Sequence, residues 1–321
     1  MNPSYGRYYK LSEYYRRMSV GKKVHKVTVD AGFSCPNRDG TLSFDGCVYC
    51  DNRTFSLNTR TPLRPVQVQI REGIERLKMR FGAEKFVVYF QAYSNTYAPV
   101  EVLRKSYDTV RSFKDVIGIS VATRPDCVSD EVVRLLAGYA HTYDVWIEYG
   151  LQSIHNKTLE RINRGHTYED FLKALHLTRK CGLLKTCAHL ILGLPGETKE
   201  MMFETARALG TLMLEGVKIH PLHVIRQTAL EEEFLNGTYA PLARNEYIDL
   251  ACGFLEYLWP GTVIHRIGAD CPQELLVAPT WILDKNRLLE AIDKRLCEKN
   301  SRQGKEYTGK NQKEALTHTL H

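Results

Sequence analysis

The chain has 321 residues, of which 43% are hydrophobic and 25% are charged, a balance typical of a globular protein with a buried core. It contains no run of about eighteen apolar residues, which excludes a membrane-spanning helix, and its first residues lack the apolar segment of a secretion signal. We therefore expect a cytoplasmic protein without a membrane partner, in which a reducing environment disfavours disulfides among the nine cysteines.

The net charge of +7 is concentrated at the N-terminus, where residues 1–25 are expected to form a short basic arm. Residues 1–26 contain seven Lys or Arg residues and one acid, interleaved with five tyrosines. Basic side chains pair with phosphates and aromatic rings stack on unpaired bases, so this composition suits an RNA partner. The alternative is an amphipathic helix whose tyrosines pack on the main domain while its charges face water.

Residues 26–225 alternate between apolar runs and amphipathic segments. The apolar runs, rich in β-branched and aromatic residues, are 27–31, 86–92, 116–123, 145–151, 188–192 and 217–224. The amphipathic segments between them include 66–79, 100–113, 131–140, 171–179 and 201–214, and Thr167 with Asp170 predicts a capping box at the start of one helix. Buried strands separated by helices favour an α/β fold with a parallel sheet. Six repeats predict a partial (β/α)6 TIM-like barrel, with its active site at the carboxyl ends of the strands.

The C-terminal third is predicted to add little to the barrel. Residues 226–297 hold one or two helices and the stretch "TVIHRIGADCPQELLVAPTW", which we interpret as a small cap that is too short for a second catalytic domain. Residues 298–321 have almost no apolar periodicity and predict a polar, flexible tail.

Three cysteines follow the first predicted strand with the spacing C-x11-C-x2-C: Cys35, Cys47 and Cys50. A closed structural zinc site needs four protein ligands, and only distant residues such as His25 or Cys127 could supply the fourth. Three thiolates can instead hold a cubane iron–sulfur cluster whose fourth iron stays open to another ligand. The pattern therefore favours a catalytic [4Fe-4S] cluster, with zinc as the alternative.

These cysteines, with Tyr49 before the last of them, resemble the cluster motif of the radical S-adenosylmethionine (SAM) enzymes. "CPNRDGT" after the first cysteine resembles the YhcC/YtqA branch of that family, which is related to the catalytic subunit of Elongator. The motifs "YFQAYSNTYAP", "ATRPD", "IEYGLQS", "INRGHT" and "LILGLPGET" follow successive strands in the order of this branch. The resemblance covers about residues 15–285 and implies a partial barrel of the radical SAM type.

The resemblance also implies how the cofactor is held and used. SAM would chelate the open iron, and one electron from the cluster would cleave it to methionine and a 5′-deoxyadenosyl radical. The residues expected to bind the cofactor lie next to the cluster, at the ends of the second and fourth strands, and on the helix that follows the fourth strand. They are Tyr49, Gln91, Tyr93, Asn95, Glu148, Gln152 and Arg161. Arg164 is the alternative to Arg161 as the bidentate partner of the SAM carboxylate.

Each of these residues also has a purely structural interpretation. Polar residues at strand ends can serve only the loops, and arginines on a polar helix can form surface ion pairs. Glu148 lies within an apolar strand, where an unpaired acid is rare. We interpret the histidines of the last two strands as core or mouth residues, whereas Cys127 and Cys271 remain possible redox partners.

The resemblance implies a tRNA substrate. The Elongator subunit builds a substituent at C5 of the wobble uridine, but this chain has no room for the acetyltransferase domain that this step requires. For the YhcC/YtqA branch the implied step removes the carboxymethyl group of 5-carboxymethylaminomethyl-(2-thio)uridine and leaves 5-aminomethyl-(2-thio)uridine. The expected partners are the tRNA anticodon stem-loop and an electron donor such as flavodoxin or ferredoxin. The alternatives are a radical SAM enzyme for a small metabolite or peptide, and a non-catalytic zinc RNA-binding module.

Overall fold

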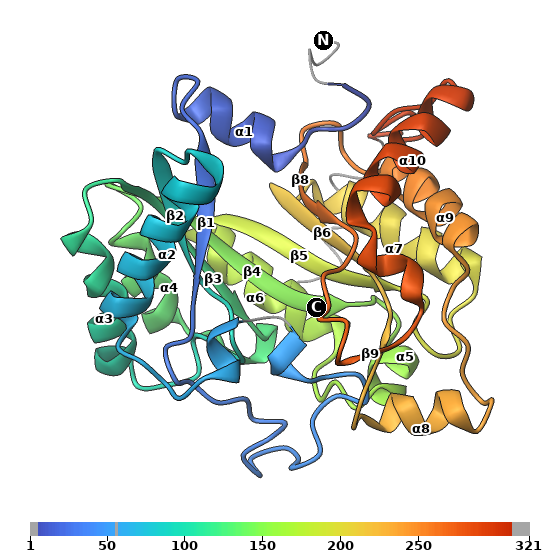
Figure 1. Ribbon diagram of the computed structural model, residues 1–321, viewed down its shortest axis with the longest axis horizontal. Helices are drawn as coiled ribbons and strands as arrows, with labels where there is room; N and C mark the ends of the chain where they lie inside the picture. Colours follow the sequence, from blue (N-terminus) through green and yellow to red (C-terminus); the bar gives the residue numbers. More distant parts are fainter. Residues whose placement is uncertain (1–5, 55–56, 310–321) are drawn as a thin grey trace.

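The computed structural model describes residues 6–54 and 57–309, and its centre is a sheet of seven parallel strands bent into a half-barrel (Figure 1). The strands lie side by side in chain order, each parallel to the next. They are β1 (Val24–Val29), β2 (Lys85–Phe90), β3 (Val116–Thr123), β4 (Asp144–Gln152), β5 (Lys185–Leu192), β6 (Gly216–Pro221) and β8 (Val263–Ile267). Two short antiparallel strands form a separate pair, β7 (Val224–Ile225) and β9 (Leu276–Ala278).

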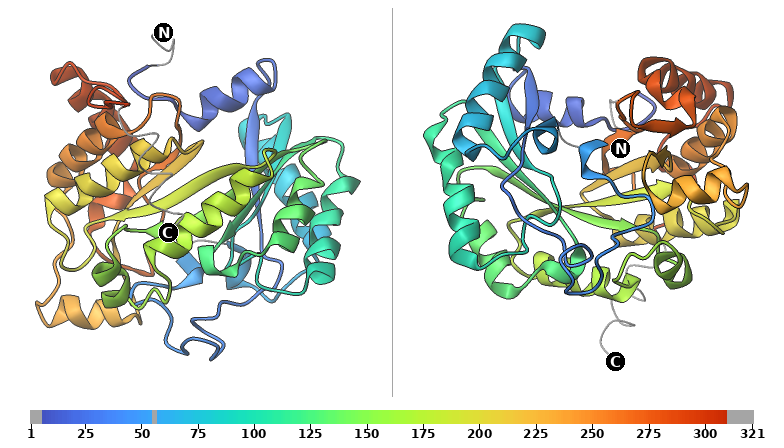
Figure 2. Two further views of the ribbon diagram at one scale, coloured as in Figure 1. Left: turned by 180° about the vertical axis from the view of Figure 1, so that it is seen from behind. Right: turned by 60° about the horizontal axis from the view of Figure 1, so that its bottom comes forward.

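Helices cover the convex face of this sheet, and Figure 2 shows them as an outer layer around the curved strands. The α-helices are α1 (Leu11–Met18), α2 (Val66–Phe81), α3 (Val100–Asp108), α4 (Asp130–Ala137), α5 (Asn156–Arg161), α6 (Tyr168–Lys180), α7 (Lys199–Leu212), α8 (Ala229–Leu235), α9 (Arg244–Tyr257) and α10 (Lys285–Glu298). Short 3-10 helices are η1 (Asn52–Thr54), η2 (Leu57–Arg60), η3 (Thr109–Ser112), η4 (Pro125–Cys127) and η5 (Thr280–Leu283). Within the described ranges, none of the helices has the length and apolar character needed to cross a membrane.

The strand β4 shows how one sequence stretch serves both the core and the site. Successive side chains of a strand point to opposite faces. Tyr149 faces the helices, where its hydroxyl lies 2.6 Å from Thr178 Oγ1 and its ring packs edge-on against Phe171 of α6. Its neighbours Glu148 and Gly150 instead line a cavity on the concave side. The strand β4 is therefore buried on both faces, and its apolar run contains the cavity residue Glu148.

The partial α/β barrel predicted from the sequence is confirmed, with one strand more than expected. The capping box is also present, since Thr167 Oγ1 accepts from the Asp170 amide and the Asp170 carboxylate accepts from the Thr167 amide. The seventh strand β8 comes from the stretch that we assigned to a cap, so the sheet does not end at residue 225. The polar pair His265 and Arg266 within β8 hid its apolar pattern.

The N-terminal arm packs against the amino ends of the strands, and in Figure 1 α1 lies at the opposite end of the sheet from the cysteine loop. Tyr8 and Tyr15 are buried, and the Tyr14 ring contacts Trp146 with its hydroxyl 2.9 Å from Asp144 Oδ1. The structure therefore supports the amphipathic-helix interpretation for these tyrosines and removes them as a base-stacking surface. Tyr5 lies outside the described residues.

The predicted polar tail does not begin at residue 298. Ser301 and Gln303 are buried, and the Gln303 side chain donates to the carbonyls of Trp259 and Thr262 at 2.9 and 2.8 Å. Residues 298–309 therefore belong to the packed molecule, because these polar contacts hold a segment without apolar periodicity. The rest of the predicted tail, residues 310–321, lies outside the described residues.

Candidate active site

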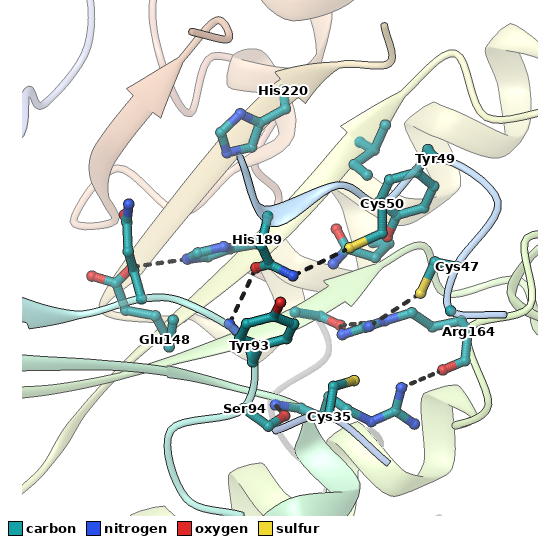
Figure 3. Close-up of a pocket in the computed structure, with 18 of the residues that line it drawn as sticks. Cys35, Cys47, Tyr49, Cys50, Tyr93, Ser94, Glu148, Arg164, His189 and His220 are labelled. Carbon is teal, nitrogen blue, oxygen red and sulfur yellow. Dashed lines mark hydrogen bonds and ion pairs between the residues drawn. The ribbon is translucent and has the colours of Figure 1, made fainter. Parts of the chain in front are cut away.

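A cavity of about 220 Å³ opens at the carboxyl ends of the strands. The three cysteines of the predicted motif line it together, from the loop that follows β1 (Figure 3). This agrees with the position predicted from the barrel, since side chains after successive parallel strands converge at one end. All nine cysteines are free.

Two asparagines fix the shape of the cysteine loop. Asn37 Nδ2 donates to the carbonyl of Asn163 at 2.5 Å, and Asn163 Nδ2 donates to the carbonyl of Gly46 at 2.7 Å. The backbone amide of Val48 donates to the carbonyl of Ile162 at 3.1 Å. The segment between α5 and α6 thus holds the loop in a preformed shape, although nearly all of the loop's own residues are irregular in structure.

Arg164 places a buried cation beside the cysteines. Its Nη1 lies 3.5 Å from Cys47 Sγ, while its Nε and Nη2 donate to the carbonyl of Gly150 at 3.2 and 2.8 Å. Burial by itself disfavours the charged guanidinium, but the neighbouring Cys47 and Tyr49 raise the pKa of Arg164 overall. Burial also raises the pKa of the Cys50 thiol to about 12. Three thiols with one buried cation fit an anionic iron–sulfur cluster, since the cation compensates the charge of the bound thiolates.

The turn that places Arg164 in the cavity requires a glycine at position 165. Gly165 has φ +73°, and a Cβ there would lie 2.5 Å from Asn37 Oδ1. A side chain at this position would therefore be strained and would displace the asparagine that holds the cysteine loop. The motif "INRGHT" thus has a structural explanation, since each of its central residues positions the loop or the cation.

The structure brings most of the predicted cofactor-binding residues to the cavity wall: Tyr49, Gln91, Tyr93, Glu148 and Gln152. Tyr93 and Gln152 have positive φ values of 59° and 74°, a backbone conformation that costs energy in non-glycine residues and is concentrated at functional sites.

Two predicted residues do not line the cavity. Asn95 is fully buried, and its Nδ2 donates to the carbonyls of Ala92 and Ala122 at 2.9 and 3.0 Å, so it joins the loop after β2 to β3. Arg161 is half exposed and pairs with Glu233 at 2.5 Å. Arg164, the alternative in the sequence analysis, is the arginine that reaches the cysteines. Cys127 and Cys271 also lie outside this cavity.

Glu148 is the centre of a buried ionic network on the inner wall, and Figure 3 shows it beside His189. Its Oε1 lies 2.6 Å from Lys26 Nζ and accepts from Ser120 Oγ at 2.5 Å. Its Oε2 pairs with Lys218 Nζ and lies 2.8 Å from His189 Nε2. Because protein groups occupy both oxygens, the predicted contact of Glu148 with SAM is not supported by its surroundings.

The network fixes the charges of its members. Burial alone would raise the pKa of Glu148, but Lys218 and Lys26 outweigh it and hold this pKa well below its usual range. Burial lowers the pKa of Lys218 to about 8, that of His189 to about 4 and that of His265 to about 3. At neutral pH the carboxylate is therefore charged and the two histidines are neutral.

Lys26 and Lys218 were missed in the sequence analysis. A lysine inside a strand as apolar as "GVKIHP" is rarely buried unless it is paired, and this is the signal that could have identified Lys218. Lys26 was counted with the basic arm, yet it lies in β1 and joins Glu148 across the sheet. The histidines of β5 and β6, which were interpreted as core or mouth residues, line the cavity.

Comparison with known proteins agrees with this geometry. Residues 35–209 match the model of the radical SAM superfamily, and residues 214–298 match that of the radical SAM C-terminal domain. YtqA of Bacillus subtilis is 39% identical over 97% of this chain and 96% of its own length. YhcC of Escherichia coli is 37% identical over 87% of this chain and 89% of its own length.

More distant similarity links the chain to Elongator proteins. Elongator complex protein 3 of Danio rerio is 27% identical over 82% of this chain, which covers 56% of that protein. The solved structure of Elp3 from the archaeon Methanocaldococcus infernus aligns with 88% of this chain at a TM-score of 0.66 and 22% identity. This chain covers 64% of that archaeal chain, and the likeness shows a shared fold. The branch predicted from the motifs is therefore confirmed.

Proposed function

Because the chain belongs to the radical SAM superfamily, we propose that it is an enzyme that modifies the C5 substituent of the wobble uridine in tRNA. The proposed step converts 5-carboxymethylaminomethyl-(2-thio)uridine to 5-aminomethyl-(2-thio)uridine. The CH2 of the carboxymethyl group would lose a hydrogen atom to the 5′-deoxyadenosyl radical, then one electron to the cluster and a proton to water, and hydrolysis of the resulting imine would release the amine and glyoxylate. The observation that supports it most is the division of the cavity, which has three cysteines on one wall and the cation Lys218 on another. A substituent whose reactive CH2 is next to a carboxylate could be held between these walls.

The superfamily uses a [4Fe-4S] cluster and SAM, so the three cysteines are assigned to a cluster rather than to zinc. When bound, these cofactors supply a 5′-deoxyadenosyl radical that abstracts hydrogen from carbon. Cys35, Cys47 and Cys50 would hold the cluster, and the Arg164 guanidinium would compensate its charge. Gln91 and the left-handed Tyr93 and Gln152 would orient SAM from the surrounding strand ends.

The walls of the cavity would restrict the reaction to one carbon of the substrate. The carboxyl-end cavity is walled by buried strands, which keep bulk water from a reactive intermediate. In the proposed substrate, the carbon between the amine and the carboxylate is the one whose radical both neighbours stabilise. A protein that fixes the carboxylate on its inner wall would therefore present this carbon, and no other, to the abstracting group.

The mouth of the cavity offers contacts for a nucleic acid. Phe44 and Leu42, in the cysteine loop, are 77% and 53% exposed. Arg53 on η1 and Arg60 on η2 lie near Asn52, which lines the cavity, and they pair with the acids Asp51 at 2.6 Å and Glu274 at 3.7 Å, which phosphates would have to replace. Exposed aromatic rings can stack on the unpaired bases of an anticodon loop, and arginines can contact its phosphates.

The test is the wobble nucleoside itself. In a deletion strain, mass spectrometry of digested tRNA should show that the carboxymethylaminomethyl nucleoside accumulates and the aminomethyl nucleoside is lost. The wild-type gene should restore both levels, whereas a Cys47→Ala gene should not. Unchanged nucleosides would refute the proposal.

A matching assay uses the purified protein under anaerobic conditions, reconstituted with iron and sulfide and supplied with SAM and a reductant such as reduced flavodoxin. Bulk tRNA from the deletion strain should stimulate 5′-deoxyadenosine formation, and tRNA from the wild-type strain should do so less. Equal formation without any tRNA would favour a small metabolite or peptide as the substrate.

A further inference from the structure

The ionic network on the inner wall of the cavity has an unbalanced positive charge. Lys26 and Lys218 both pair with Glu148, so two ammonium groups share one carboxylate. The next cation along the wall, Arg266, does not contact Glu148 and pairs instead with Asp270 at 2.9 Å, a carboxylate that it shares with the half-exposed Lys285 at 3.0 Å. Buried charges are costly unless they are paired, so a network with one excess cation is suited to receiving an anion.

Of the two lysines in the network, Lys218 is the one that lines the cavity. Its ammonium group has three N–H donors, and among the described residues it contacts only two acceptors, Glu148 and the hydroxyl of Tyr89 at 2.8 Å. One N–H therefore has no acceptor within residues 6–54 and 57–309. Lys26 does not line the cavity, so the donor that a ligand can reach belongs to Lys218.

The surrounding rings add polarity without adding charge. His220 lines the cavity from the same strand and has no hydrogen-bond partner among the described residues, and its ring lies 6.2 Å from that of His189. Burial, together with the nearby Arg266, keeps the pKa of His220 well below its usual range, so this ring is neutral. A neutral ring beside Lys218 can donate to an anion or accept from an amine next to it.

From this geometry we propose that the inner end of the cavity is a carboxylate subsite, in which Lys218 binds a carboxylate of the substrate opposite the cysteines. One excess positive charge matches one carboxylate better than a doubly charged phosphate. The inference rests on the proposed function only for the identity of the molecule that carries the carboxylate. SAM is a second source of this group, and the experiment separates the two.

The first experiment compares two synthetic anticodon stem-loops, one with 5-carboxymethylaminomethyluridine and one with 5-aminomethyluridine at the wobble position. Their affinities for the cluster-loaded protein are measured by fluorescence anisotropy. The wild type should bind the carboxylate-bearing RNA roughly tenfold more tightly, as a charge-assisted hydrogen bond in a buried site predicts. Lys218→Met should abolish this preference, and Lys294→Met, on the exposed face of α10, should retain it.

Lys218→Met removes the excess positive charge and leaves Glu148 paired with Lys26, so the network becomes neutral and the variant should fold. Thermal denaturation checks this. If Lys218→Met unfolds, Lys218→Gln replaces it, because it retains an N–H for Glu148 or Tyr89 and removes only the charge. SAM affinity is measured on the same variants and should not change. A loss of SAM binding in the Lys218 variants would show that Lys218 binds the carboxylate of SAM and not that of the substrate, which would overturn the proposal.

The second experiment does not depend on RNA. N-methylglycine, which carries a carboxylate, a CH2 and a secondary amine, is titrated into the cluster-loaded protein and followed by saturation-transfer NMR. The subsite is supported if N-methylglycine binds to the wild type and to Lys294→Met but not to the Lys218 variant. This conclusion holds even if neither RNA binds, because absent RNA binding would refute only the proposed function. Absent binding by the wild type, or equal binding by the Lys218 variant, would overturn the subsite.

Discussion

Arg164 and Arg161 stand three residues apart in the chain, yet their surroundings are opposite. The Arg164 guanidinium is buried against Cys47, whereas that of Arg161 is nearly half exposed and paired with Glu233. The cause is the left-handed turn at Asn163 and Gly165, which redirects the chain after α5 into the cavity. Residue identity alone does not separate the two arginines, because the difference arises from a backbone turn.

This contrast gives the first prediction. Arg164→Met should lower the reduction potential of the [4Fe-4S] cluster by on the order of 100 mV, since a buried positive charge within about 6 Å favours the more negative reduced state. Arg161→Met, a matched exposed variant, should leave the potential unchanged. An EPR-monitored redox titration measures both, and iron content confirms that the clusters are assembled. Equal potentials in the two variants would contradict the role of Arg164.

At the scale of a single element, α1 shows why composition misleads. Its tyrosines and arginines alternate as they would in an RNA-binding arm, but the helical period sorts them onto two faces. Tyr15 is buried against the sheet, while Arg16 and Arg17 face water and pair with Glu13. The helix therefore closes the amino end of the barrel, and its two arginines share one carboxylate on their own helix.

The second prediction concerns the stability of this closure. Tyr15→Ala should lower the free energy of unfolding by about 3–5 kcal/mol, the usual cost of deleting a buried aromatic side chain. Tyr15→Phe should change it by less than about 1 kcal/mol, because the hydroxyl is buried without a hydrogen-bond partner among the described residues. Urea denaturation of the three proteins measures both values. A large loss in Tyr15→Phe would mean that the hydroxyl has a partner.

At the scale of the whole molecule, the sequence predicted the parts of the fold that have local signals. Alternating apolar and amphipathic segments are local, and so is the cysteine spacing, so the barrel and the Cys35–Cys50 loop were predicted correctly. The network of Lys26, Glu148 and Lys218 was not predicted, because its members lie on three different strands and meet only through the curvature of the sheet. The strand β8 was missed because its inward residues are polar, as the concave face requires.

The buried histidines of the concave face give the third prediction, an acid-sensitive fold. An unfolded histidine takes up a proton near pH 6.5, whereas burial lowers the pKa of His189 to about 4 and that of His265 to about 3. The unfolded state therefore binds more protons below pH 6.5, and stability is lost as the pH falls through this window. Each histidine should cost about 2 kcal/mol of unfolding free energy between pH 7 and pH 5.

A single substitution isolates one of these contributions. His265 Nδ1 lies 3.6 Å from Glu148 Oε1, beyond hydrogen-bond distance, and its ring packs on Trp146 with ring centroids 4.4 Å apart, so His265→Phe should preserve the packing and remove the titration. Between pH 7 and pH 5, the unfolding free energy of the His265→Phe variant should fall less than that of the wild type, as measured by urea denaturation. His141→Gln, at an exposed position, should keep the wild-type dependence. An unchanged pH dependence in His265→Phe would show that this ring is charged in the folded protein.

For the proposed tRNA substrate, the two ends of the barrel predict the side from which it would bind. The cavity lies at the end that carries η1 and η2, whereas α1 lies at the other end, so we expect the wobble base of the proposed substrate to enter from the side of Arg53 and Arg60. Arg53→Gln with Arg60→Gln should weaken stem-loop binding and reduce the slope of log affinity against log salt by about 0.7 for each phosphate that the protein no longer neutralises. Arg16→Gln with Arg17→Gln, the control pair on α1, should leave the slope unchanged. If the α1 pair reduced the slope and the mouth pair did not, RNA would bind at the closed end, where its wobble base could not reach the cysteines.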